Sequence, residues 1–132
     1  MKDINELHIP DDRRYSDDHE WAAVVGDGLR IGISDYAQDQ LGDIVFVELP
    51  QIGARFGRND EFGVVESVKS VSGLLMPVGG EVTAVNTGLE KNPEYVNTSP
   101  YDKGWLIEIR PDSPSGLDDL MNADDYLRML RG

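Results

Sequence analysis

Lys69 is the side chain whose surroundings most clearly suggest chemistry. It lies between the small polar residues Ser67 and Ser70, and apolar runs typical of strands precede and follow it. An amine at the tip of such a hairpin would be exposed, and once deprotonated it is a nucleophile that an enzyme can acylate. The chain has four lysines, and Lys69 is the only one between Lys2 and Lys91. Most exposed lysines are only solubilising charges, so position alone leaves both interpretations open.

A run of polar residues, Asp17-Asp18-His19-Glu20, is the second candidate because carboxylates and imidazole bind metal ions. Four adjacent side chains cannot all converge on one ion. The run leads directly into a predicted strand, where alternation sends His19 and Glu20 to opposite faces. The other histidine, His8, has no ligand spacing to any residue. We therefore predict no metal site.

Independent catalysis has no supporting pattern. No serine lies in a Gly-x-Ser-x-Gly turn, and both glycine-rich phosphate-loop patterns are absent. With 25 acidic residues in 132, pairs of carboxylates arise by chance and indicate nothing. The chain has no cysteine, which excludes disulfides, thiolate zinc sites, iron–sulfur clusters and thiol catalysis. A stand-alone hydrolase therefore has no supporting constellation in this sequence.

The charge and the apolar runs restrict the partners. Twelve basic and 25 acidic residues give a net charge of −13, which repels nucleic acid and anionic lipid and suits docking on basic protein surfaces. The longest apolar stretches fall far short of the roughly 18–20 residues of a membrane span. Residues 1–6 lack the apolar core of a signal peptide. We expect a bacterial cytoplasmic protein that binds neither nucleic acid nor membrane.

The length suits one domain, residues 1–132. Short strand-like runs recur between glycine and proline turns, which predicts a small antiparallel β-sandwich or barrel. Ser34 should cap a short helix over residues 35–41, ended by Gly42, and Asn122 should cap a second one. The remaining predicted segments are an extended lead-in (1–18), strands at 21–25, 29–33, 43–49, 81–86 and 104–110, a hairpin (61–76) with Lys69 at its tip, and C-terminal helices (115–131).

Residues 66–72, Glu-Ser-Val-Lys-Ser-Val-Ser, resemble the lipoyl-lysine motif of the glycine cleavage system H protein family. The resemblance extends in order along nearly the whole chain, which makes it highly specific. The other matching blocks are Tyr15-Ser16, His19-Glu20-Trp21, Gly32-Ile33, Ala37-Gln38, the run from Leu41 to Pro50, Pro77-Val78, Gly80-Glu81-Val82, Val85-Asn86, Pro93, Val96-Asn97, Pro100-Tyr101 and Gly104-Trp105.

The resemblance implies a mainly β barrel-sandwich hybrid and a lipoyl group in amide linkage on Lys69. Members of this family are carriers, not enzymes. They take an aminomethyl group from P protein, the glycine decarboxylase, to T protein, the aminomethyltransferase, and L protein, a dihydrolipoyl dehydrogenase, reoxidises them. A lipoate ligase or a lipoyl/octanoyl transferase must load the lysine. That enzyme would recognise the hairpin through Glu66, Ser67, Val68 and Ser70.

The chain departs from the family pattern near the arm. Family members commonly have an acid four residues after the lysine, which helps to hold the cationic aminomethyl arm in a cleft, and this chain has Gly73 there. A histidine frequent in the short helix is replaced by Gln40. Glu20 matches another cleft acid, and Asp18 lies close enough in sequence to compensate for the missing one. Glu20, Asp18 and Gln40 are therefore the candidate cleft residues, and Gly73 predicts weaker protection of the loaded arm.

Other carriers fit less well. Biotinyl lysines usually lie between methionines, whereas the neighbours here are Val68 and Ser70. Lipoyl domains of dehydrogenase complexes are usually shorter, often have Asp before the lysine, and adjoin linkers rich in proline and alanine. The departures at Gly73 and Gly79 and the unusually apolar residues 74–76 leave one alternative open. It is an H-like lipoate relay or regulatory protein that passes lipoyl groups to other enzymes.

Overall fold

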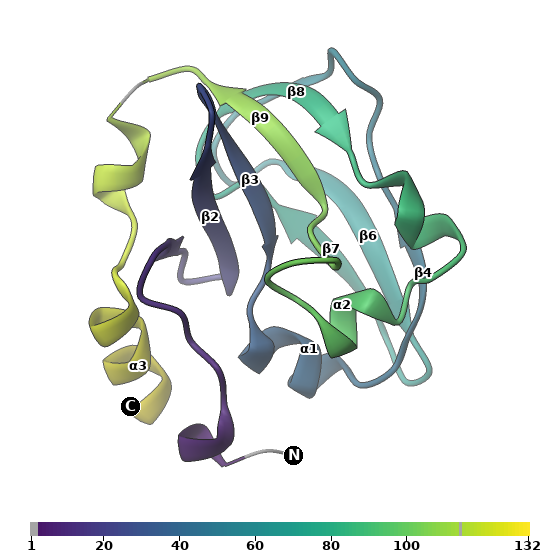
Figure 1. Cartoon of the computed structure of the whole chain (residues 1–132), viewed down its shortest axis with the longest axis vertical. Helices are drawn as coiled ribbons and strands as arrows, with labels where there is room; N and C mark the ends of the chain where they lie inside the picture. The colour runs from purple at the N-terminus through teal and green to yellow at the C-terminus, as the bar shows by residue number, and fades with distance from the viewer. Residues whose placement is uncertain (1–2, 114) are drawn as a thin grey trace.

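Two antiparallel sheets form the body of the protein in this computed structural model, which describes residues 3–113 and 115–132 (Figure 1). The larger sheet has the strand order β1-β2-β3-β9-β8-β5, and the smaller has the order β4-β6-β7. This agrees with the predicted mainly β, sandwich-like fold. The strands are β1 (Arg14–Tyr15), β2 (Glu20–Val25), β3 (Gly28–Ile33), β4 (Ile44–Glu48), β5 (Arg55–Phe56), β6 (Glu61–Ser67), β7 (Val71–Leu75), β8 (Gly80–Val85) and β9 (Ile107–Pro111).

Short helices connect and flank the sheets. Ser34 caps α1 by accepting a hydrogen bond from the backbone N–H of Ala37, and Asn122 caps α3 in the same way through Asp125, as the sequence predicts. No helix in the described part of the chain is long and apolar enough to cross a membrane. The helices are α1 (Asp35–Leu41), α2 (Tyr95–Thr98) and α3 (Ala123–Arg131), and the 3₁₀ turns are η1 (Ile4–Glu6), η2 (Thr87–Glu90) and η3 (Gly116–Asp119).

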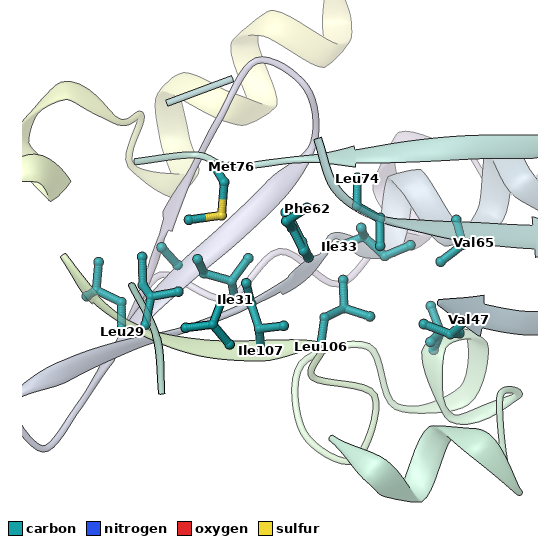
Figure 2. Packing of buried hydrophobic residues seen from close by; sticks show 14 of the residues in the cluster. Leu29, Ile31, Ile33, Val47, Phe62, Val65, Leu74, Met76, Leu106 and Ile107 are labelled. Atoms are coloured by element: carbon teal, nitrogen blue, oxygen red, sulfur yellow. The ribbon is translucent and has the colours of Figure 1, made fainter. Parts of the chain in front are cut away.

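The main core lies between the two sheets. Alternation along β3 sends Leu29, Ile31 and Ile33 inward, where they meet side chains of β6 and β7 such as Val65 and Leu74. Figure 2 shows these side chains interdigitating, with Met76 and Phe62 filling the space between them. The core therefore joins the hairpin β6–β7 to the larger sheet.

A second, smaller core covers the outer side of the larger sheet. The ring of Tyr126 in α3 stacks on Tyr15 with centroids 4.6 Å apart, and Trp21 and Ala123 complete the cluster. Figure 1 shows α3 and the N-terminal segment side by side next to β2. The C-terminal helix is thereby attached to the strand that begins at Glu20.

Some local predictions need correction. The lead-in is not wholly extended, because it contains η1 and the short strand β1. Strand β5 gave no clear signal, since two residues are too few for a periodic pattern. The last strand begins at Ile107 rather than at Gly104, because the side chain of Asn86 binds the carbonyls of Lys103 and Trp105 and holds that segment out of the ladder.

Gly32 makes room for the indole of Trp21, its partner across β2 and β3. A methyl group at position 32 would lie 2.6 Å from two ring carbons of Trp21. The indole is wholly buried and donates a hydrogen bond to the carbonyl of Pro100. We expect Gly32→Ala to lower the free energy of unfolding by roughly 2–3 kcal/mol in urea denaturation. Gly57→Ala, on an exposed turn, is the control, and an equal loss in both variants would contradict this account.

Candidate functional site

The turn between β6 and β7 presents Lys69 to solvent. The side-chain oxygen of Ser67 accepts hydrogen bonds from the backbone N–H of Lys69 (3.2 Å) and of Ser70 (3.0 Å). The backbone N–H of Ser67 donates to the carbonyl of Ser70 at 2.8 Å, which closes the turn. These bonds satisfy the backbone of the tip without using the Lys69 amine. The hairpin therefore fixes where the side chain starts and leaves its end free to react.

The tip of the hairpin rests on the connection between α1 and β4. The backbone N–H of Val68 donates to the carbonyl of Asp43 at 3.0 Å. Gly42 has a φ of 81° and ends α1, and a Cβ atom there would lie 3.3 Å from Cε of Lys69. Glycine thus allows both the left-handed backbone and the close approach of the lysine. Lys69 consequently begins its path beside the last residues of α1.

Asn97, in α2, holds this connection in place. Its side-chain oxygen accepts a hydrogen bond from the backbone N–H of Ile44 (2.8 Å), and its amide donates to Gly42 O and to the side-chain oxygen of Gln38 (2.9 Å each). One side chain therefore joins the end of α1, the turn and the start of β4. Asn97 belongs to a matching block of the sequence, but nothing in the sequence indicates this contact, because its partners lie more than 50 residues away.

We expect Asn97→Ala to lower the free energy of unfolding by about 2 kcal/mol, because it leaves several partly buried groups without partners. Asn97→Asp keeps the acceptor for Ile44 but loses both donors, so it should be destabilising as well. Urea denaturation measures both effects. Asn92→Ala is the matched control because the Asn92 amide contacts none of these atoms, and an effect as large as that of Asn97→Ala would contradict the role assigned to Asn97.

A cavity of about 300 Å³ lies between α1, the start of β2 and the hairpin. It is lined by all three candidate cleft residues, Glu20, Asp18 and Gln40, so the structure brings them together. Lys69 does not line it, but Leu41 does, and Leu41 immediately precedes Gly42, beside which the lysine side chain lies. The rest of the lining is mostly apolar and consists of His19, Ile33, Tyr36, Ala37, Val65, Ser72, Gly73 and Leu74 besides Leu41.

Glu20 is an acid in a largely apolar setting. Its side chain is 3% exposed, accepts a hydrogen bond from the hydroxyl of Ser16 (3.0 Å), and lies 3.4 Å from the backbone N–H of Leu75. Burial raises the pKa of Glu20 to about 8, although the hydrogen bonds from Ser16 and Leu75 act in the opposite direction. The cavity therefore contains a carboxyl group whose raised pKa favours the neutral form near pH 7.

The prediction that His19 and Glu20 point to opposite faces is wrong. His19 has a φ of 73°, so its backbone is left-handed rather than extended, and the alternation expected of a strand does not apply. Both side chains line the same cavity. Among the described residues, no group of three or more histidine, aspartate and glutamate side chains could hold a metal ion.

Gly73 also lines the cavity, and a neighbouring acid lies close to it. A Cβ atom at position 73 would collide with the carboxylate of Glu61, on the paired strand β6. Because Gly73 has no side chain, it leaves room for the carboxylate of Glu61. Where family members commonly have an acid, this chain therefore has Gly73 with the carboxylate of Glu61 close by. The sequence alone does not show this contact, because it depends on the pairing of β6 with β7.

Comparisons with known proteins identify the family. The pattern that describes the Glycine cleavage H-protein family matches residues 13–132. A glycine cleavage system H protein of Anoxybacillus flavithermus is 55% identical over 124 residues, which cover 94% of this chain and 98% of that protein. The corresponding protein of Salinibacter ruber is 55% identical over 91% of this chain and 97% of its own length.

The fold leads to the same family. The crystal structure of a glycine cleavage system H protein from Mycobacterium marinum superposes with a TM-score of 0.85 at 37% sequence identity, covering 94% of this chain and all of that one. The sequence and the architecture therefore agree over the same length of chain. This chain belongs to the glycine cleavage H-protein family.

Proposed function

We propose that this protein is the lipoyl carrier of the glycine cleavage system, with residues 1–132 as a single carrier domain and Lys69 as the attachment site. It delivers the aminomethyl group from P protein to T protein, and L protein then restores the oxidised arm. One observation carries the proposal. An exposed lysine at a hydrogen-bonded hairpin tip lies beside α1, whose side chains line a cavity large enough to hold part of an attached arm.

The residues present fit a lipoyl group. The attached lipoate supplies a redox-active disulfide that a polypeptide without cysteine lacks. Glu66, Ser67, Val68 and Ser70 shape the hairpin that the loading enzyme, a lipoate ligase or a lipoyl/octanoyl transferase, recognises. The apolar walls of the cavity suit an alkyl chain. Tethering the arm to Lys69 gives it a high effective concentration at this cavity and at each partner's site.

The polar residues of the cavity suit a cationic cargo. A positive charge entering beside Glu20 lowers the pKa of that carboxyl group, so Glu20 releases its proton to solvent and pairs with the cation. Asp18 adds negative charge at the rim, and Gln40 offers an uncharged hydrogen-bonding group there. These three side chains hold the amine away from bulk water while the carrier moves between its partners.

We infer the partners and the cellular location from the family and the net charge. The net charge of −13 favours docking on basic surfaces of the P, T and L proteins, and we place the protein in a bacterial cytoplasm. The alternative, a lipoate relay that serves other enzymes, is not favoured, since the curated relatives described above all bear the name glycine cleavage system H protein.

Mass spectrometry of the intact chain tests the proposal. Incubation with a lipoate ligase, ATP and lipoate should add the mass of one lipoyl group, and peptide mapping should locate it on Lys69. The loaded chain should then support glycine–bicarbonate exchange by P protein, whereas the unloaded chain should not. A chain that stays unmodified with an active ligase would overturn the attachment, and a loaded chain without exchange would overturn the glycine cleavage role.

A further inference from the structure

A line of hydrogen-bonding side chains connects both helices α1 and α3 to the cavity. The hydroxyl oxygen of Ser34 accepts a hydrogen bond from the backbone N–H of Ala37 (3.1 Å) and lies 2.7 Å from the hydroxyl of Tyr126. That hydroxyl lies 2.8 Å from Nδ1 of His19. The proposed function uses none of these contacts. Ser34 and Tyr126 are wholly buried, so their hydroxyl groups must find partners within the protein.

The direction of these hydrogen bonds follows from counting protons. The backbone N–H of Ala37 can only donate, so the Ser34 oxygen accepts from it. Within the described chain, the contacts of Ser34 offer its own proton a single acceptor, the oxygen of Tyr126. The proton of Tyr126 must then go to Nδ1 of His19. The reverse direction would leave the buried proton of Ser34 unpaired, which costs free energy.

The direction determines the state of His19. If Nδ1 accepts a proton from Tyr126, the neutral imidazole carries its own proton on Nε2. Burial lowers the pKa of His19, against the opposing effect of Asp17 and Asp18, so the ring is neutral above its ordinary titration range. The ring of Tyr36 packs against it with centroids 4.8 Å apart, which further restricts its orientation.

Nε2 is the part of His19 that is available to a ligand. His19 lines the cavity, and no described residue forms a hydrogen bond with Nε2. No buried side-chain nitrogen in the described ranges 3–113 and 115–132 lacks a partner, so Nε2 is accessible rather than buried. The left-handed backbone of His19 is a conformation that the surrounding structure has to maintain, as is common at binding sites.

We propose that Tyr126 is a positioning residue that fixes His19 as the neutral Nε2–H tautomer, so that His19 donates a hydrogen bond to the sulfur end of an arm in the cavity. The identity of this ligand rests on the proposed function, whereas the tautomer does not. An N–H donor cannot pair with an ammonium group, but thiol and thioether sulfur are weak acceptors. The cavity thus separates two tasks, because Glu20 and Asp18 meet the cation and His19 meets the sulfur.

Nitrogen-15 NMR of the histidine side chains in the unmodified chain tests the tautomer directly. At a pH where the rings are neutral, long-range proton–nitrogen correlations should show His19 with its proton on Nε2, and His8 provides an internal comparison. Finding the proton on Nδ1 would overturn the proposal. This measurement needs no variant and no lipoyl group.

Tyr126→Phe tests the positioning role. It removes the donor to Nδ1, so the ratio of the Nε2–H to the Nδ1–H form should fall roughly three- to tenfold. Tyr15→Phe is the matched control, since it also loses a buried hydroxyl beside Tyr126 but one that bonds the carbonyl of Pro10. It should leave the ratio unchanged. Equal ratios in wild type and Tyr126→Phe would overturn the role of Tyr126.

Loading tests the ligand. When mass spectrometry shows that the chain carries the lipoyl group and this group is reduced to the dithiol, the Nε2–H resonance of His19 should move from its position in the unloaded chain. No shift in a fully loaded chain would overturn the sulfur contact. A chain that cannot be loaded at all would overturn the proposed function and with it the identity of the ligand, while the tautomer measurement would still decide the role of Tyr126.

Discussion

A Lys69→Arg chain is expected to take up no lipoyl group and to support no glycine–bicarbonate exchange. The guanidinium group stays protonated at any pH that the protein tolerates, so it cannot attack an acyl donor. The substitution keeps the positive charge, and the turn is held by the Ser67 oxygen and the backbone rather than by the lysine amine. The loss should therefore be complete while the fold is unchanged.

The controls for this variant separate chemistry from stability. Lys91→Arg removes another exposed lysine, far along the chain from the hairpin, and should be loaded like the wild type. Both variants should unfold in urea within about 0.5 kcal/mol of the wild type, as exposed substitutions usually do. Uptake of a lipoyl group by the Lys69→Arg chain would place the attachment elsewhere and contradict the proposed site.

Local signals predicted much of the fold. Ser34 and Asn122 were recognisable as helix caps because their side chains replace missing backbone partners, which is a property of a few adjacent residues. Gly42 was recognisable as a helix end for a similar reason. Strand order was not readable in this way. The pairing of β3 with β9, for example, joins segments almost 80 residues apart, and short strands carry too little pattern to specify distant partners.

The candidate site likewise contains some residues that the sequence predicts and others that it does not. Lys69 and the cleft residues Glu20, Asp18 and Gln40 could be selected from the motif and the resemblance, and the cavity contains the latter three. The position of His19 could not, because a left-handed residue breaks the alternation on which the prediction relied. The contact between His19 and Tyr126 could not be predicted either, because the two residues are 107 positions apart in the sequence. Burial of Glu20, and hence its pKa, likewise arises only when the two sheets and α1 come together.

Glu20 is expected to make the stability of this protein depend strongly on pH. Its pKa is about 8 in the folded chain because it is buried, against an ordinary value of 4.5. Between these two values the folded chain holds a proton that the unfolded chain has lost. The contribution of Glu20 is therefore fully present below about pH 4.5 and is lost as the pH rises towards 8, at roughly 1.4 kcal/mol per pH unit.

Glu20→Gln should remove this slope, because the amide has nearly the same shape and does not ionise. Urea denaturation at pH 5.5 and 7.5 measures it, and the wild type should lose roughly 2–3 kcal/mol relative to Glu20→Gln between these conditions. Glu48→Gln, at an exposed position on β4, is the matched control and should follow the wild type. Parallel curves for wild type and Glu20→Gln would mean that Glu20 is already ionised at neutral pH.

Glu20→Gln also distinguishes the effect of Glu20 on folding stability from its effect on the cationic cargo. A neutral carboxyl group that ionises only beside a cation avoids a buried charge in the empty cavity at pH 7 and still provides a negative charge when the cargo arrives. Gln at position 20 is also uncharged in the empty cavity, but it cannot become negative when the cargo arrives. A Glu20→Gln chain whose lipoyl arm carries the aminomethyl group should therefore lose this one-carbon unit faster than the wild type at pH 7. Its fold should nevertheless be at least as stable in urea as that of the wild type. Equal rates of loss, measured by the formaldehyde released, would show that Glu20 does not hold the cationic amine.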